Sequence, residues 1–310
     1  MKKSLLAATA VALFAGSAFA ADLPSRKEPV LLPPPPPPPL WTGFYLGLNA
    51  GYTFSDSNSV NTVVTPTGAS AGWPHGAGVD TIPHLSALSA ATSGRAPINS
   101  DGFIGGGQIG YNYQFGNSFV AGIEADIQGI AGSRRSANAW SVAAVGPTDP
   151  SNYIGSSAAS KSLDYLGTVR GRLGFLFTPT LLVYGTGGLA YGGVSTSSSI
   201  FASNDVYSPS NHLPPVFGGS AFSDTRVGWT AGGGLEWLFL PNWSAKVEYL
   251  YYDLGSVTTN FAFPQVDNSS GLSASFGGQS TTRFNGHIVR AGVNYHFNLF
   301  SAPAPVVAKY

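Results

Sequence analysis

Residues 44–54 decide the fold, and they read FYLGLNAGYTF. Every second side chain of this stretch is apolar, namely Phe44, Leu46, Leu48, Ala50, Tyr52 and Phe54. The positions between them carry Tyr45, Gly47, Asn49 and Gly51. Because successive side chains of a β-strand point to opposite faces, this alternation predicts a strand with one apolar face and one polar face.

The same alternation recurs in further stretches, at residues 103–115, 119–128, 163–175, 181–194, 226–237, 243–251 and 289–297. Short turns join them at residues 116–117, 178–180 and 240–242, whereas residues 55–101, 131–160, 195–225 and 255–282 form long connections. Short turns on one rim and long loops on the other are typical of outer-membrane barrels, with the short turns facing the periplasm. The pattern predicts an all-β fold, an eight-stranded antiparallel up-and-down transmembrane β-barrel with four long extracellular loops. We expect no regular structure in those loops, which are rich in Ser, Asn, Gly and Pro.

The first residues predict export. Lys2 and Lys3 precede an apolar run at residues 5–14, and Ala18-Phe19-Ala20 is a small-x-small cleavage site. These features are typical of a cleaved signal peptide at residues 1–20, and the predicted location is the outer membrane of a Gram-negative bacterium. No later segment has 18 uninterrupted apolar residues, so membrane-spanning helices are not predicted.

Three further segments complete the predicted organisation. Residues 21–40 form a proline-rich periplasmic leader, in which the prolines at 33–39 favour an extended polyproline II rod. This rod is either a stiff leader or a spacer that binds a periplasmic partner. The barrel covers residues 41–297, and residues 298–310 form a C-terminal tail.

The composition excludes several functions. Only 10% of the residues are charged and the formal net charge is zero, which argues against nucleic-acid binding. The chain has no cysteine, so disulfides, thiolate metal sites and cysteine nucleophiles are excluded.

Aromatic residues distinguish a membrane barrel from a soluble one. We expect an outward-facing girdle at the short-turn rim, formed by Trp41, Tyr113, Phe115, Phe119, Phe175, Phe177, Trp237, Phe239, Trp243, Tyr295 and Phe297. Aromatic rings gather at membrane–water interfaces, whereas a soluble barrel has no reason to ring one end with them.

Charged residues on the strands fall on the polar face. They are Glu124, Asp126, Asp164, Arg170, Arg172, Arg226, Glu236, Lys246, Glu248 and Arg290. An eight-stranded barrel is only wide enough for side chains to fill it, so we expect these charges to pair as a plug that blocks solute flow. The alternative is a narrow wet pore lined by the same residues.

Two glycine patterns imitate nucleotide-binding motifs: Gly105, Gly107 and Gly110, and Gly185, Gly187 and Ala190. Both lie inside two-faced strands with no helix following, so nucleotide binding is not predicted.

Histidines and paired carboxylates give little support to catalysis or metal binding. His75, His84, His212, His287 and His296 are scattered, although loop histidines could bind an iron porphyrin or a metal. The carboxylates Glu124 and Asp126 are better explained as partners of neighbouring basic residues than as the catalytic pair of a hydrolase. No nucleophile elbow, a turn between a strand and a helix that presents a serine, is predicted. We predict no enzyme activity, no metal site and no cofactor.

Four segments resemble a known family: WTGFYLGLNAGY at 41–52, YLGTVRGRLG at 165–174, YGTGGLAYG at 184–192 and VRAGVNYHF at 289–297. They are similar to the small immunogenic and porin-like β-barrel proteins of alphaproteobacterial outer membranes, which are related to the OmpA-like transmembrane barrel. The resemblance implies a surface antigen that supports envelope integrity and presents its loops to hosts or neighbours. It implies outer-membrane lipid and the outer-membrane assembly machinery as partners. Family members commonly end at a phenylalanine, whereas this chain continues past Phe297.

We therefore predict a structural outer-membrane barrel with a plugged interior. The alternatives are a narrow porin that conducts small solutes and, because some members of the family bind heme, a surface protein that binds heme or another ligand.

Overall fold

A computed structural model describes residues 40–76, 78, 80–205 and 213–297. The predicted signal peptide, the predicted leader up to residue 39 and the predicted tail at 298–310 lie outside these residues, as does His212.

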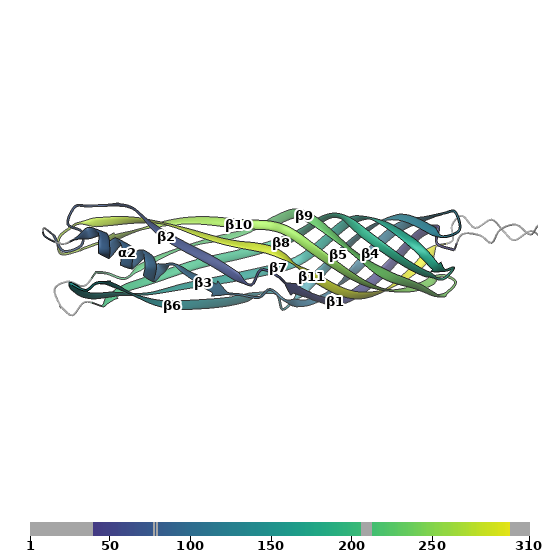
Figure 1. Cartoon of the computed structure of the whole chain (residues 1–310), viewed down its shortest axis with the longest axis horizontal. Helices are drawn as coiled ribbons and strands as arrows, with labels where there is room; N and C mark the ends of the chain where they lie inside the picture. Colours follow the sequence, from purple (N-terminus) through teal and green to yellow (C-terminus); the bar gives the residue numbers. More distant parts are fainter. Residues whose placement is uncertain (1–39, 77, 79, 206–212, 298–310) are drawn as a thin grey trace, which may run out of the picture. The chain divides into compact units, whose positions relative to one another are not determined.

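Eight antiparallel strands close into a ring (Figure 1). In ring order they are β1 (Gly43–Ser55), β4 (Gly102–Phe115), β5 (Phe119–Ala131), β7 (Asp149–Thr178), β8 (Leu181–Asp205), β9 (Val216–Leu240), β10 (Trp243–Val266) and β11 (Ser273–Phe297). The pairing of β1 with β11, from Phe44 opposite Phe297 to Ser55 opposite Gly286, closes the ring. This confirms the predicted eight-stranded barrel. Closure leaves no free edge in the ring, so every ring strand has a neighbour on both sides.

The ring places apolar side chains outside and polar side chains inside. Leu48 is 73% exposed and Leu173 is 68% exposed, whereas Arg170 and Lys246 are at most 2% exposed. This is the reverse of a soluble protein and matches a barrel whose outer face lies in hydrocarbon. Among the described residues, no helix is long and apolar enough to cross a membrane.

The long connections are regular structure, so the expectation of irregular loops is wrong. The strands β7 to β11 continue far beyond the ring, and three more strands join them: β2 (Ser59–Ala69), β3 (Gly94–Pro97) and β6 (Arg135–Gly146). Together with the helix α2 (Thr81–Thr92) they form a lobe beyond the long-loop rim (Figure 1). Backbone pairing builds these strands, largely between strands that follow one another in the chain, such as β6 with β7 and β8 with β9. The Ser-rich sequence gives no alternating signal for this pairing.

The lobe consists of two sheets. Pairing between β9 and β10 stops at Asp253 opposite Trp229, where β10 has a bulge between Asp253 and Ser256. Gly255 lies inside this bulge with φ +80°, a conformation that favours glycine. Beyond it, β6 and the outer parts of β7, β8 and β9 form the first lobe sheet. The outer parts of β10 and β11, with β2 and β3, form the second lobe sheet.

The helix α2 helps to fill the lobe. The Asp80 side chain accepts a hydrogen bond from the amide of Ile82 at the N-terminus, which satisfies one of the free helix donors. The buried residues of α2 recur at helical spacing and are His84, Ala87, Leu88, Ala91 and Thr92. They contribute to an apolar core that includes Trp73, Tyr153 and Phe276, which come from segments far apart in the chain.

Candidate functional site

Eight charged side chains meet inside the ring and form what we call the lumen network. They are Glu124 and Asp126 on β5, Arg170 and Arg172 on β7, Glu236 on β9, Lys246 and Glu248 on β10, and Arg290 on β11. Each is buried, and the spacing of two within β5, β7 and β10 directs both members of each pair inward. Four acidic groups face four basic groups, so the network has no net charge.

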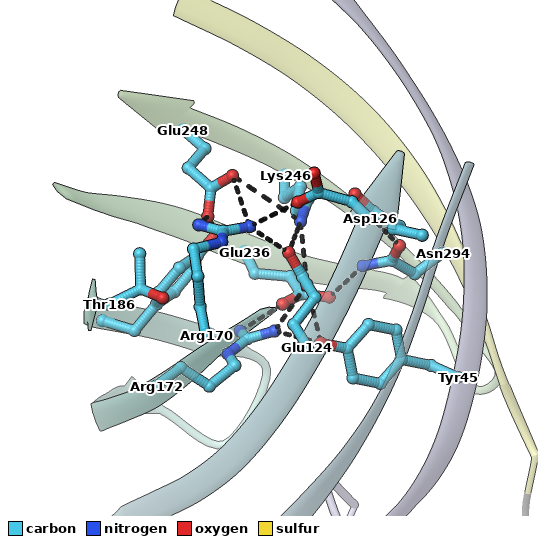
Figure 2. A network of polar contacts seen from close by, with 12 residues as sticks. Tyr45, Glu124, Asp126, Arg170, Arg172, Thr186, Glu236, Lys246, Glu248 and Asn294 are labelled. Carbon is cyan, nitrogen blue, oxygen red and sulfur yellow. Dashed lines mark hydrogen bonds and ion pairs between the residues drawn. The ribbon is translucent and has the colours of Figure 1, made fainter. Parts of the chain in front are cut away.

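Arg170 lies at the centre of the lumen network. Its Nη2 atom is 2.5 Å from Oε1 of Glu124 and 2.9 Å from Oδ2 of Asp126. Its Nη1 atom is 2.9 Å from Oε1 of Glu248, and Figure 2 shows these contacts radiating from one guanidinium. A guanidinium has five N–H donors in a planar fork, so one side chain can serve three carboxylates.

Two further bases complete the central group. Arg290 donates from Nη2 to Oδ2 of Asp126 at 2.8 Å and from Nε to Oε2 of Glu248 at 2.7 Å. Lys246 donates to Oε1 of Glu124 at 2.8 Å. Each of the three acids in this group therefore contacts at least two bases, and this multiple pairing offsets the cost of removing the charges from water.

A second pair lies nearer the short turns. The Nη2 atom of Arg172 is 2.5 Å from Oε2 of Glu236, and Glu236 also accepts hydrogen bonds from Ser244 at 2.6 Å and Asn294 at 2.7 Å. The Arg172 guanidinium lies 4.0 Å from the centre of the Tyr184 ring, a cation–π distance.

Tyr45 connects the pair to the central group. Its hydroxyl donates to Oε2 of Glu124 at 2.7 Å and accepts from Nη1 of Arg172 at 3.0 Å (Figure 2). The ring of Tyr45 lies against Gly110, where an added Cβ would be 2.3 Å from the tyrosine oxygen. Glycine is therefore required at this position by close packing inside the barrel, and it is the last glycine of the pattern that imitates a nucleotide motif.

Apolar layers lie on both sides of the lumen network. Along β7 the buried residues Leu163 and Leu166 precede Arg170 and Arg172, and Leu176 follows them. The layer toward the lobe includes Leu166, Leu250, Phe284 and Ile288. The layer toward the short turns consists of Trp41, Val120, Leu176, Leu182, Tyr184 and Leu238. The polar interior is thus bounded by apolar side chains at both ends.

Two of the ten predicted lumen charges lie elsewhere. Asp164 is exposed because a bulge between Leu163 and Tyr165 shifts the register of β7 and turns Leu163 inward instead. Arg226 lies where β9 and β10 separate, and it donates to the carbonyl oxygen of Ser256 at 3.2 Å. Neither residue contacts the lumen network.

Ten of the eleven predicted girdle residues have exposed side chains, between 37% and 71%. Neighbouring rings touch around the rim, as for Phe119 and Phe175, whose ring centres are 5.5 Å apart. Trp41 is the exception, and its placement in the girdle is wrong. It is fully buried in the layer at the short-turn end, and its Nε1 atom donates to the carbonyl of Pro179 at 3.0 Å.

A second aromatic rim, which was not predicted from the sequence, lies on the lobe side of the exposed apolar band. Its ring contacts join Tyr52 to Phe103 at 5.0 Å and Trp229 to Tyr251 at 5.3 Å. The signal was present, because these residues share the outward positions of their strands, and two girdles are expected of a membrane barrel.

The histidine positions that the structure describes do not form a metal site. No group of three or more His, Cys, Asp or Glu side chains in the described part of the chain could hold a metal ion. In the lobe, His84 is buried with Nε2 3.0 Å from Oδ2 of Asp149, and its Nδ1 is 3.3 Å from the Tyr153 hydroxyl. Burial lowers the pKa of His84 below its ordinary value despite the opposing effect of Asp149.

One more buried base lies between the lobe and the ring. Lys161 donates to the carbonyl oxygens of Ser57 at 2.8 Å and Arg283 at 2.7 Å. Its partners are neutral carbonyls, so this lysine ties strands together and is not part of the lumen network.

Comparisons with known proteins agree with this geometry. The family model described as "Outer membrane protein beta-barrel domain" matches residues 6–297. The chain is 34% identical over 305 residues to the 31 kDa outer-membrane immunogenic protein of Brucella melitensis, covering 95% of this chain and 100% of that protein. It is 25% identical to the 25 kDa outer-membrane immunogenic protein of Brucella abortus, covering 96% of this chain and 99% of that protein.

The chain also matches a solved structure. The outer membrane protein OprG of Pseudomonas aeruginosa matches with a TM-score of 0.34 and 11% identity, covering 83% of this chain and 97% of that chain. The ring of eight strands, its exposed apolar face and the match of residues 6–297 to the family model lead to one conclusion: this outer-membrane protein belongs to the outer membrane β-barrel family.

Proposed function

We propose that the protein is a closed structural barrel of the outer membrane, without enzyme activity, whose lumen network fixes the barrel and blocks solute flow. The observation that carries this proposal is the order of layers inside the ring: apolar, ionic, apolar. A conducting pore needs a continuous polar path, and buried leucine and aromatic side chains interrupt it at both ends of the network.

The narrow porin is the competing function. The same eight charges would line its wall, but direct contacts between Arg170 and acids on both β5 and β10 span the lumen and leave those groups bonded to each other. An ion in transit would have to displace a buried carboxylate from its guanidinium, which is costly in a poorly hydrated interior.

Conductance across a planar bilayer tests closure. We expect the purified wild-type protein to give no steady channels, and Arg172→Ala to raise the conductance because it removes a cation that fills the lumen. The matched control is Arg283→Ala, which removes an exposed arginine beyond the ring and should give no steady channels. Steady channels from the wild type would refute the closed barrel and favour the porin.

We further propose that the lobe faces the outside, where it contacts hosts or neighbouring molecules, and that the short turns face the periplasm. Outer-membrane lipid surrounds the ring, and the outer-membrane assembly machinery inserts it. The absence of native cysteine makes single-cysteine labelling clean. A membrane-impermeant maleimide should label Ser270→Cys in the lobe on intact cells and should label Asn117→Cys at a short turn only after the outer membrane is opened. The reverse result would invert the orientation.

A further inference from the structure

An aromatic row crosses the outer face of the first lobe sheet. Trp140 on β6 is opposite Ser156 on β7, which is opposite Phe201 on β8, which is opposite Phe217 on β9. Trp140 is 65% exposed and Phe217 is 70% exposed, and the rings of Phe201 and Phe217 are 5.3 Å apart. Because this row lies beyond the membrane-embedded ring, lipid does not explain it, and exposed aromatic groups of this kind mark interaction sites.

A band of hydroxyl groups lies between this row and the ring. Ser160 and Ser197 share a hydrogen bond of 2.7 Å across β7 and β8, and Ser195 and Ser223 share one of 3.0 Å across β8 and β9. Two shallow hollows of about 360 and 400 Å³ follow this band, and Ser160 and Ser197 line both of them. Each hydroxyl can both donate and accept, so the band suits a ligand that is itself rich in hydroxyl groups.

The face carries almost no charge. The segments 136–144, 152–162, 194–205 and 217–223 contain two charged residues. Lys161 is buried, and Asp205 lies opposite Asn152 at the end of the sheet farthest from the ring. Two further charged residues lie at the edge of this face nearest the ring. Arg134 lines one of the hollows, and Asp164 accepts a hydrogen bond from Ser162. A nucleic acid would need a basic face. Hydroxyl groups for hydrogen bonding and flat rings for the C–H faces of sugars are a combination that suits a saccharide.

The same strands carry this face out of the membrane. Tyr191 belongs to the outward positions of β8 near the second aromatic rim, and the Tyr165 hydroxyl is 2.7 Å from Oγ1 of Thr225. From Tyr191 the hydroxyl band begins about 13 Å along β8 and the aromatic row lies about 33 Å along it, at ~3.3 Å per residue. The face is therefore continuous with the lipid-embedded surface, and a saccharide attached to outer-leaflet lipid would stand directly against it.

We propose that the outer face of the first lobe sheet binds the oligosaccharide headgroup of an outer-leaflet glycolipid. The hydroxyl band contacts the sugars nearest the membrane, and Trp140, Phe201 and Phe217 stack on sugars farther out. This inference rests on the proposed orientation of the lobe, but it is independent of whether the lumen conducts.

The second lobe sheet supplies a matched control. Its outer face also carries hydroxyl and amide groups, with a bond of 3.1 Å between Thr258 and Thr281 and one of 3.2 Å between Gln279 and Asn260. It includes one exposed base on β3, Arg95, which lies opposite Asn61. Val63 on this face is 57% exposed and lies outside the aromatic row. Val63→Ser therefore removes an exposed apolar side chain from the lobe without touching the proposed site.

The test is binding by the full-length protein in detergent micelles, measured by calorimetry with two purified lipo-oligosaccharides, one with its complete sugar core and one truncated to the lipid-proximal sugars. We expect the complete form to bind about tenfold more tightly, a difference of about 1.4 kcal/mol, because only its outer sugars reach the aromatic row. The double variant Trp140→Ser with Phe217→Ser should lose the difference, and Val63→Ser should keep it. Each variant is folded if its unheated and heated samples still migrate differently on gels, as those of the wild type do.

Four results would overturn the proposal. Equal affinity for the two glycolipids would show that only the lipid-facing ring binds. An unchanged preference in the double variant would exclude the aromatic row. If sedimentation shows a dimer for the wild type and a monomer for the double variant, the aromatic row binds a second copy of this chain instead. Inverted cysteine labelling would refute the proposed orientation, and the glycolipid could then not be the natural ligand. Steady channels in the bilayer would refute only the closed barrel and would leave the glycolipid proposal standing.

Discussion

Arg170 on β7 bonds to Glu248 on β10 across the inside of the barrel, with 2.9 Å between Nη1 and Oε1. The two strands are three steps apart around the ring. A direct bond between them means that the side chains of the lumen network, rather than water, fill this level of the barrel. The lumen network therefore acts as a cross-brace between walls that backbone hydrogen bonds do not join.

Loss of Arg170 should destabilise the barrel strongly. Arg170→Ala leaves Glu124, Asp126 and Glu248 with fewer bases than acids, and breaking such a buried pair costs about 3–5 kcal/mol. We expect a lower midpoint of unfolding in guanidinium chloride, followed by the heat-modifiable shift on gels. Arg283→Ala is the control, because Arg283 pairs with Asp253 while its side chain stays 52% exposed, and its midpoint should not change. Equal midpoints for the two variants would contradict a bracing role.

Removing both members of an ion pair should cost less than removing one. Arg172→Met leaves Glu236 buried without its guanidinium, and Glu236→Met leaves Arg172 in the same position. The double variant replaces two charges by two apolar side chains of similar length, so we expect it to be more stable than either single variant by about 1–4 kcal/mol. A double-mutant cycle of unfolding midpoints measures this coupling. Simple additivity of the two single effects would refute it.

Glycine at position 110 should be intolerant of even one methyl group. Gly110→Ala places a Cβ within 2.3 Å of the Tyr45 ring, so Tyr45 must move and give up its bonds to Glu124 and Arg172. We expect a loss of about 1–3 kcal/mol in the free energy of unfolding, as for overpacking elsewhere. Gly129→Ala is the matched control on the next strand, where an added Cβ meets nothing within 4 Å. A similar stability for both variants would show that Tyr45 adapts freely.

Acid should loosen the helix α2. Burial holds the pKa of His84 below its ordinary value of 6.5, so the folded lobe favours neutral His84. The contribution of His84 to the free energy of unfolding is complete above the pKa of His84 in the unfolded chain. It decreases as the pH falls below that value. The groups around His84 are Asp149, Asp80, His75 and Tyr153, and the two carboxylates limit the loss without reversing it.

Hydrogen exchange of residues 81–92, corrected for the intrinsic effect of pH, measures this loosening. Protection at pH 7.5 should decline by pH 5.5 in the wild type. His84→Gln should remove the difference between the two pH values, and His287→Gln, on β11, should retain it. Unchanged protection in the wild type would show that His84 does not govern the helix.

Much of the barrel follows from alternation. The apolar face of residues 44–54 and its seven counterparts predicted the ring, and the short turns predicted the antiparallel order. Alternation also directed eight charges inward, because every second residue of a strand shares a face. The prediction for Asp164 was wrong because a β-bulge adds a residue to one strand only. No local sequence signal indicates this bulge.

Trp41 could have been placed correctly from the same rule. It shares the odd-numbered positions of Gly43 and Tyr45, which point inward, whereas Phe44 and Leu46 point outward. The lobe is different. Its strands are rich in serine, alanine and glycine, which give no apolar alternation, so the sequence does not reveal how they pair. The helix α2 did have signals, in Asp80 as a cap and in the spacing of His84, Leu88 and Ala91, but twelve residues inside a long polar connection did not stand out.

The seam between β1 and β11 sets a condition on the timing of assembly. Phe44 can pair with Tyr111 of β4 early, but its other neighbour, Phe297 of β11, is available only when nearly the whole barrel has been synthesised. No partial ring can therefore close by itself. Until then both seam strands are unsatisfied edges, open to wrong pairing with other chains. A chain shortened before β11 should therefore accumulate as an aggregation-prone precursor, and closure becomes the final, all-or-none act of its biogenesis.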